Sequence, residues 1–285
     1  MYNLKRLNNR NIKYFREIYN SSHNLISDFF AIYDDESLIK KYLIRKNVFL
    51  LCSNGKYVGY IWIDENNGYY SIIDLYILEK YNNVYTLTVL LKSILNYKNI
   101  RFKSEENNLL LQIITEYGFQ IKSQVREMEY TMQSKISLPL IDGLYVENFK
   151  KGVDEPIRCR LQNEIFNKKD RLPMQIKDIY YDEMQKYYYD KGVFLLTFKG
   201  VYIGIGQIIY EGSTPILVNF GVIKEYRKKG FGEYFLKYIL NFMKAQKEDI
   251  VLLKVSNENN AAKILYKKVG FIEKKVIYTL IRQDD

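Results

Sequence analysis

The strongest constraint on the fold is a pattern that occurs twice. Ser-Glu-Glu-Asn-Asn at 104–108 precedes Gly118-Phe119, and Ser-Asn-Glu-Asn-Asn at 256–260 precedes Gly270-Phe271 with the same spacing. Upstream of each pattern, a stripe of large apolar residues also repeats, at 90–95 and at 235–240. Self-similarity of this kind indicates repeated structural units. We therefore expect two copies of one β-α-α-β-β-β-α-β-α-β unit.

Local patterns agree with this plan. In the first copy we expect strands at 2–6, 48–52, 57–63 and 70–78, with helices at 11–19, after Ser37, and around 87–95. In the second we expect strands from about 144, at 194–200, at 201–210 and at 250–255, with helices at 156–166 and 176–189. A chain of 285 residues has room for about two domains. The predicted class is α/β with a mixed sheet in each half.

The second copy contains a glycine-rich turn that the first lacks. An apolar strand ends in Arg227-x-x-Gly230-x-Gly232, and an amphipathic helix follows at once. A helix N-terminus presents unpaired backbone N–H groups and the positive end of the helix dipole. Glycines let the backbone turn sharply and leave room for a ligand oxygen. The turn is therefore a candidate phosphate site.

A second motif follows downstream. Asn259-x-x-Ala262-x-x-Leu265-Tyr266 is followed by Val269 and Gly270, after a β-type run at 250–255. The spacing of Ala262, Leu265, Tyr266 and Val269 places them on one helical face. Gly270 is suited to end the helix.

The two motifs together resemble those of the GNAT superfamily of N-acetyltransferases, and the resemblance covers the C-terminal half. It implies a central, mostly antiparallel, twisted sheet flanked by helices, with acetyl-CoA along the splayed fourth strand. By this resemblance the pyrophosphate lies on the N–H groups of Lys228, Lys229, Gly230, Phe231 and Gly232, next to Arg227. The backbone of Phe220 and Val222 would pair with the pantetheine arm. Asn259 would bond that arm or cap its helix, and Tyr266 would be the general acid or a packing residue.

The first copy resembles the family in pattern only. Residues 82–87 stand opposite 227–232 and contain neither the arginine nor the glycines, and Ile114 stands opposite Tyr266. We therefore expect a degenerate domain at 1–135 that lacks the pyrophosphate turn. A linker at 136–142 would lead to the acetyltransferase domain at 143–285.

The general base and the acceptor are left open by the sequence. The fourth strand, 215–223, holds no acid, so the base is Glu211, a water held by Asn219, or none if the amine arrives neutral. Residues 167–190 precede the hairpin and are rich in tyrosine. These tyrosines either line a pocket for the acceptor or are ordinary residues of the core and the surface.

The composition of the chain argues against several other classes of protein. The net charge of +10 comes from lysines scattered among acids, so we favour a solvated lysine surface over nucleic-acid binding. No apolar run reaches the roughly 18 residues of a membrane span. Cys52 and Cys159 are expected as buried thiols in a reducing compartment such as the cytoplasm. A single histidine, His23, argues against a histidine metal site.

The leading hypothesis is an acetyl-CoA-dependent N-acetyltransferase that transfers an acyl group to a primary amine of a small molecule or peptide. One alternative is a coenzyme A sensor or scaffold without turnover. Another is a tandem-domain aminoacyl transferase that holds charged tRNA, against which the intact glycine turn argues. The oligomeric state and the acyl chain length stay open.

Overall fold

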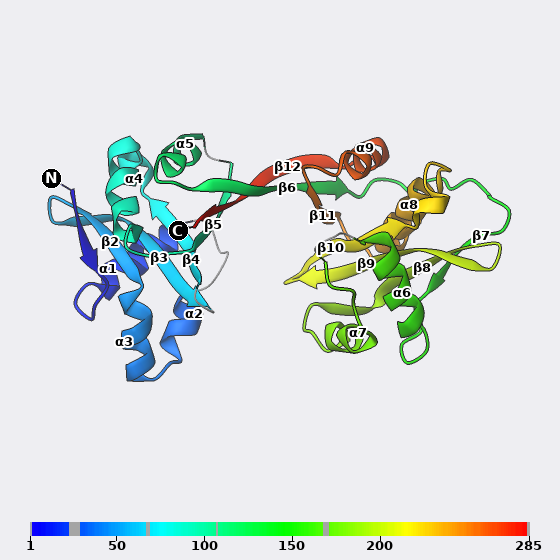
Figure 1. Ribbon diagram of the computed structural model, residues 1–285, viewed down its shortest axis with the longest axis horizontal. Helices are drawn as coiled ribbons and strands as arrows, with labels where there is room; N and C mark the ends of the chain where they lie inside the picture. Colours follow the sequence, from blue (N-terminus) through cyan, green and yellow to red (C-terminus); the bar gives the residue numbers. More distant parts are fainter. Residues whose placement is uncertain (1, 23–28, 67–68, 107, 168–170, 284–285) are drawn as a thin grey trace. The chain divides into compact units, whose positions relative to one another are not determined.

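The computed structural model describes residues 2–22, 29–66, 69–106, 108–167 and 171–283. It contains two compact units, one made of Met1–Gln124 with Val276–Asp285 and the other of Val125–Lys275 (Figure 1). Each unit has a mixed sheet with helices on both faces. This confirms the predicted mixed α/β class.

The elements of the first unit follow the expected order, with one additional helix. They are β1 (Tyr2–Arg6), α1 (Ile12–Ser21), α2 (Phe29–Asp34), α3 (Leu38–Lys46), β2 (Val48–Ser53), β3 (Lys56–Asn66), β4 (Tyr69–Ile77), the 3-10 turn η1 (Glu79–Tyr81), α4 (Val84–Leu91), η2 (Lys92–Ile94), β5 (Ile100–Glu105) and α5 (Asn108–Glu116). The short helix α2 has no counterpart in the sequence prediction. It contributes Phe29, Phe30 and Tyr33 to the core.

The sheet of the first unit is covered on both faces. Its strand order is β1-β2-β3-β4-β5-β12, with β12 (Ile272–Arg282) coming from the end of the chain. Among the described strand pairs of this sheet, only β4 and β5 run parallel. Because side chains alternate along a strand, Leu51 and Ile61 pack with α4 and α5, whereas Leu50 and Tyr60 pack with α1 and α2.

The second unit repeats the order of elements. It consists of β6 (Gln120–Thr131), β7 (Leu144–Asn148), α6 (Glu155–Ile165), α7 (Ile176–Glu183), β8 (Tyr188–Phe198), β9 (Val201–Glu211), β10 (Thr214–Val222), η3 (Lys224–Tyr226), α8 (Phe231–Ala245), β11 (Ile250–Ser256), α9 (Asn260–Val269) and β12 (Ile272–Arg282). The predicted helix at 176–189 was too long, because Tyr188 already pairs with Ile209 in the hairpin.

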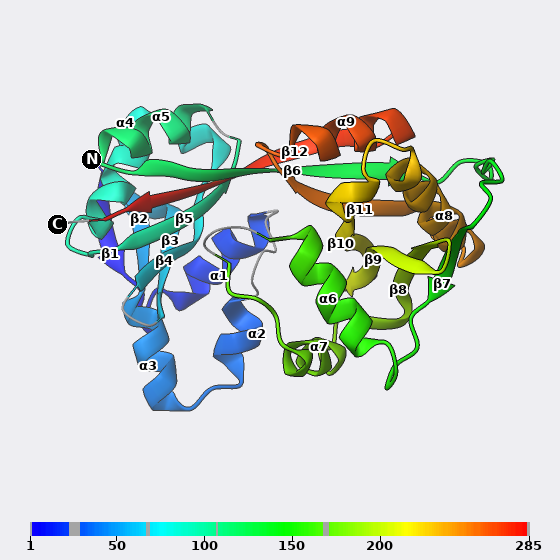
Figure 2. The same ribbon diagram turned by 45° about the vertical axis from the view of Figure 1, so that its right-hand side comes forward.

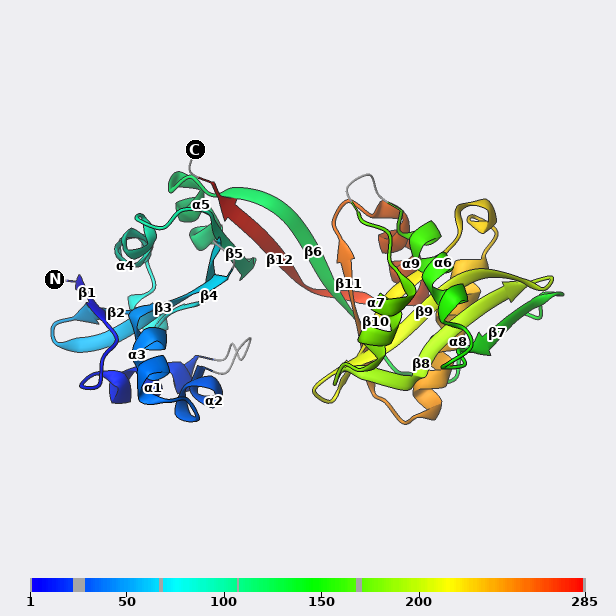
Figure 3. The ribbon, with the colours of Figure 1, turned by 60° about the horizontal axis from the view of Figure 1, so that its bottom comes forward.

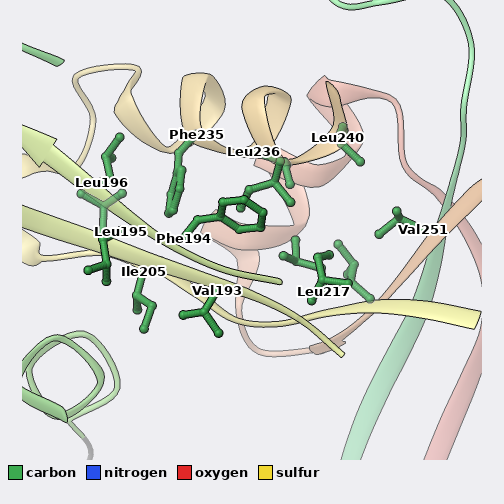
Figure 4. Packing of buried hydrophobic residues seen from close by; sticks show 14 of the residues in the cluster. Val193, Phe194, Leu195, Leu196, Ile205, Leu217, Phe235, Leu236, Leu240 and Val251 are labelled. Carbon is green, nitrogen blue, oxygen red and sulfur yellow. The ribbon is translucent and has the colours of Figure 1, made fainter. Parts of the chain in front are cut away.

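The core of the second unit lies between its sheet and α8. Phe235, Leu236 and Ile239 of α8 are fully buried, and Figure 4 shows Phe235 and Leu236 directed toward Phe194 of β8. A Cβ on Gly206 would meet α8, whereas one on Gly221 would meet Ile165 of α6. The helices α6 and α8 therefore cover opposite faces of the sheet (Figures 2 and 3).

Each unit receives its closing strand from the other half of the sequence. The second unit has the order β6-β11-β10-β9-β8-β7, with β6 paired to β11 from Val125 to Thr131. In return, Ile277–Arg282 of β12 pair with β5 of the first unit. The boundaries expected from sequence, 1–135 and 143–285, keep both strands with their own copy, whereas the compact units exchange them. The expected linker at 136–142 is also anchored, because Asn241 of α8 bonds both N and O of Ile136 at 2.8 Å.

The two cysteines, the single histidine and the membrane-span expectation have different outcomes. Both Cys52 and Cys159 are free and buried, and burial raises the pKa of the Cys159 thiol. His23 lies outside the described residues. Across the described part of the chain, no helix combines the length and the apolar character needed to span a bilayer.

Candidate functional site

The candidate site begins where two parallel strands of the second unit separate. In the part of the chain that the structure describes, β10 pairs with β11 through Ile216 with Leu252 and Leu217 with Leu253. Beyond Leu217, the β11 side of β10 has no ladder partner in the described register. On the other side a bulge between Val218 and Gly221 interrupts the pairing with β9. The open backbone of 218–222 is the segment expected to pair with a pantetheine arm.

The turn after β10 leaves its amide hydrogens unused. Lys228 and Gly230 have φ of +61° and +82°, and Gly230 is the N-cap of α8 without a side-chain cap. Within the described residues, the N–H groups of 228–232 have no recorded protein acceptor. A Cβ at Gly230 would meet nothing within 4 Å. The turn thus offers several donors and free space at the positive end of a 15-residue helix.

In the turn at 227–232, the arginine side chain bonds the protein backbone, whereas the two lysine side chains are exposed. Arg227 folds back and donates through Nε to the carbonyl of Val222 at 2.8 Å and through Nη2 to that of Ile165 at 3.4 Å. It therefore holds the turn against β10 and α6. Lys228 and Lys229 are exposed, with the Lys229 ammonium 5.1 Å from the ring centroid of Tyr226. Phe231 is buried against Phe198 and fixes the start of α8.

The equivalent helix of the first unit is closed. In α4, Asn83 accepts a hydrogen bond from the N–H of Thr86, and Thr86 accepts one from the N–H of Asn83. This capping box uses donors that α8 leaves available. The contrast is consistent with the predicted loss of the pyrophosphate turn from the first copy.

Tyr266 lies on the inner face of α9, close to the separated strand. It is 7% exposed, with ring centroids 6.3 Å from Phe220 and 5.8 Å from Phe271. Burial raises the pKa of Tyr266 to about 12. Its hydroxyl has no hydrogen-bond partner among the residues that the structure describes, and it is not fully enclosed. The ring packs in the core, and the role of the hydroxyl as general acid stays a prediction.

Asn259 has the capping role that was one of its two expected functions. Its Oδ1 accepts from the N–H of Ala262 at 3.2 Å, at the first turn of α9. At the end of β10, Val222 is buried and Phe220 stacks on Phe235 of α8 at 5.4 Å. The side chains of Phe220 and Val222 thus build the core, which leaves only their backbone for a cofactor. The cofactor contacts of all three residues stay predictions.

The two candidate bases, Glu211 and Asn219, both have protein partners, and the described tyrosines of the expected acceptor segment include exposed ones. Glu211 is 58% exposed at its side chain and forms an ion pair with Lys254 at 3.3 Å. Asn219, at φ +48° in the bulge, donates from Nδ2 to Gln207 Oε1 at 2.8 Å. Tyr180 and Tyr181 are largely exposed on α7. Residues 168–170 of the acceptor segment lie outside the described residues.

A buried polar cluster on the α6 side was missed by the sequence analysis. Arg158, Gln162 and Gln207 are completely buried. Arg158 Nη2 is bonded to Asp182 Oδ2 and, at 3.1 Å, to Gln207 Oε1, while Gln207 Nε2 donates to Asp182 Oδ2 at 3.0 Å. Part of the signal was available, since Gln207 interrupts the apolar stretch at 203–209. A polar residue at a core position has to be paired.

Burial and hydrogen bonding have opposite effects on the pKa of Asp182. Burial alone raises its pKa, but hydrogen bonds from Arg158, Gln207 and Tyr187 outweigh this and lower the pKa below the ordinary value. Asp182 is therefore an acceptor-only carboxylate at neutral pH. Glu183 next to it has the opposite shift, because burial and the charge of Glu155 raise its pKa. Among the described residues, no group of three His, Cys, Asp or Glu could hold a metal ion.

Comparisons with known proteins agree with this geometry. Residues 190–273 match the family model for the acetyltransferase (GNAT) domain. No curated protein is similar in sequence.

Solved structures share the fold at low identity. A GCN5-related N-acetyltransferase from Sphaerobacter thermophilus has a TM-score of 0.69 at 14% identity, covering 99% of this chain and 95% of that one. An acetyltransferase of the GNAT family from Colwellia psychrerythraea has a TM-score of 0.56 at 14% identity, covering 98% and 99%. A tandem GNAT protein from the clavulanic acid biosynthesis pathway has a TM-score of 0.54 at 9% identity, covering 82% and 81%. The chain therefore has the GNAT fold, and its residues 190–273 form a domain of the GNAT acetyltransferase family.

Proposed function

We propose that the second unit is an acetyl-CoA-dependent N-acetyltransferase that acts on a primary amine. The observation that carries this is the open N-terminus of α8 beside the unpaired edge of β10. Unused N–H groups at 228–232 and free space at Gly230 fit a pyrophosphate. The exposed edge of 218–222 fits an extended arm that carries amides.

The chain's own residues would then act as follows. Backbone N–H groups of the turn bind the anionic tail, and Arg227 keeps the turn in place through Val222. Bound acetyl-CoA supplies an activated acetyl thioester. A neutral amine forms the new C–N bond as the C–S bond breaks, and it loses one proton. An N–H of the bulged strand, that of Val222 by family resemblance, stabilises the oxyanion.

The hydroxyl of Tyr266 stabilises the departing thiolate. Its pKa of about 12 keeps it protonated at neutral pH, so it can donate a hydrogen bond to sulfur. A thiol has a pKa of roughly 8.5, so the phenol shares its proton with the thiolate rather than giving it up completely. The final proton on sulfur is exchanged with solvent. No residue of β10 supplies a carboxylate base, so the amine is bound neutral or loses its proton to water.

A sensor without turnover is the second candidate. It is favoured by the absence of an acid from residues 215–223 and by the ion pair that engages Glu211. Calorimetry with acetyl-CoA and with coenzyme A tests binding. A thiol-release assay with lysine, spermidine, glucosamine and hydroxylamine then tests turnover. We expect binding of both nucleotides and release with at least one amine, whereas binding without any release supports the sensor.

A further inference from the structure

The orientation of one amide in the bulge of β10 is dictated by buried charge. Asp182 Oδ2 accepts hydrogen bonds from Arg158 and from Gln207 Nε2 at 3.0 Å. A carboxylate without a proton accepts only, so Gln207 has to present its NH₂ group there. Its oxygen then faces Arg158 Nη2 at 3.1 Å, and a guanidinium donates only. Neither partner tolerates a flipped Gln207 amide.

This orientation passes on to Asn219. Gln207 Oε1 also lies 2.8 Å from Asn219 Nδ2. Because that oxygen can only accept, Asn219 has to donate to it, and its own Oδ1 points away from Gln207 as a free acceptor. No described residue is recorded as a donor to Asn219 Oδ1. This oxygen is not fully enclosed and Asn219 is half-buried, so a ligand can reach it.

The position of Asn219 places its Oδ1 atom near the proposed site of acetyl transfer. It lies in the bulge where β10 has left β11, and the next residue, Phe220, packs toward Tyr266. The amide of Asn219 bonds Gln207, which also bonds Arg158 of α6, so Asn219 faces the α6 side of the sheet. The hydroxyl of Tyr266, on α9, and the side-chain oxygen of Asn219 thus lie on opposite faces of β10. A leaving thiolate and an entering amine need such separate groups.

We propose that Asn219 Oδ1 binds the N–H of the acceptor amine, and that Gln207, Arg158 and Asp182 are positioning residues that set its orientation. This inference rests on the proposed function. It assigns a specificity role, because the free oxygen accepts a hydrogen bond from an amine N–H and has no donor to offer a carboxylate.

The test uses Asn219→Gly in the full-length protein. Its φ of +48° suits glycine, so the variant keeps the backbone of the bulge and loses only the amide. The matched control is Lys199→Gly, at φ +49° in the β8–β9 turn. The readouts are CoA release with hydroxylamine, corrected for the rate without protein, and acetyl-CoA affinity. Asn219→Gly should lower kcat/KM for hydroxylamine about three- to tenfold, as expected for one hydrogen bond, without changing acetyl-CoA affinity.

A double-mutant cycle separates positioning from stability. Gln207→Leu should cause a similar loss in the native background and no further loss in the Asn219→Gly background, because it acts through Asn219. Unchanged kcat/KM in Asn219→Gly overturns the assignment of Asn219, and independent losses in the cycle overturn the positioning role. If the unmodified protein binds acetyl-CoA but releases no thiol with any amine of the panel, the proposed function fails and this inference fails with it.

Discussion

At the scale of single residues, buried polar groups contribute most to the candidate site. Tyr266 shows how one side chain serves two purposes, since its ring fills the core while its hydroxyl stays accessible. Its place on the buried face of α9 could be predicted from the motif. The partners of Asn219 could not, because hydrogen bonds between Arg158, Asp182 and Gln207 join residues far apart in sequence, and no local pattern specifies them.

Removing the hydroxyl of Tyr266 should affect turnover alone. Tyr266→Phe keeps the ring in contact with Phe220 and Phe271, so we expect unchanged acetyl-CoA affinity by calorimetry. We expect kcat to fall about 10²-fold, the lower end for loss of an acid group. Tyr238→Phe, on a partly buried tyrosine of α8, is the control. Equal losses of affinity and turnover would contradict the assigned role.

The raised pKa of Tyr266 also predicts how stability and kcat depend on pH in the alkaline range. Its ordinary value is 10.0 and its folded value is about 12, so the protonated form is favoured in the folded protein. The resulting stabilisation is complete below pH 10 and is lost as the pH rises toward 12. A kcat profile should therefore show no decline from Tyr266 below pH 10. A decline near pH 9 that disappears in Tyr266→Phe would show that the phenol is ionised too early.

At the scale of elements, the two related helices differ at their first turn. The start of α4 is closed by Asn83 and Thr86, whereas α8 starts at an uncapped glycine. This difference was visible in the sequence, because the glycines and the arginine are missing from 82–87. Element positions were also predictable, since strands and helices have different apolar periods. The end of α7 was not, because Tyr188 joins β8 through pairing with a distant strand.

A large side chain at the uncapped turn should abolish cofactor binding. Gly230→Glu would place a carboxylate where a pyrophosphate is expected, so we expect acetyl-CoA binding below detection in calorimetry. Gly200→Glu is the matched control, because Gly200 has φ +81° against +82° at Gly230 and also has open space around it. Both variants carry the same backbone strain. Loss of binding in both would attribute the effect to strain rather than to the site.

At the scale of the whole molecule, the repeat was predictable and the exchange of closing strands was not. Strands β6 and β12 each follow the last helix of their copy in the sequence. Which partner each strand takes depends on pairing across the chain, with β6 on β11 and β12 on β5. Arg282 shows how firmly the exchange is built in, since its guanidinium donates to the carbonyls of Ile94, Leu95 and Tyr97.

A core substitution in β12 should therefore weaken the first unit. Leu280 is completely buried in the cluster that contains Phe102 and Leu110. Leu280→Ala should cost about 2–5 kcal/mol. Hydrogen exchange should show faster exchange of β5 amides and unchanged exchange of β11 amides. The control is Ile272→Ala, on an exposed residue of the same strand. Faster exchange in β11 alone would contradict the assignment of β12 to the first unit.

The exchange of strands has a consequence for biosynthesis. The first unit cannot finish its sheet when residue 124 leaves the ribosome, because the strand that borders β5 ends at Arg282. Until then the edge of β5 is without its neighbour, and an unpaired edge is a template for wrong partners. The nascent chain must therefore hold its first half in an incomplete state while the second half is translated.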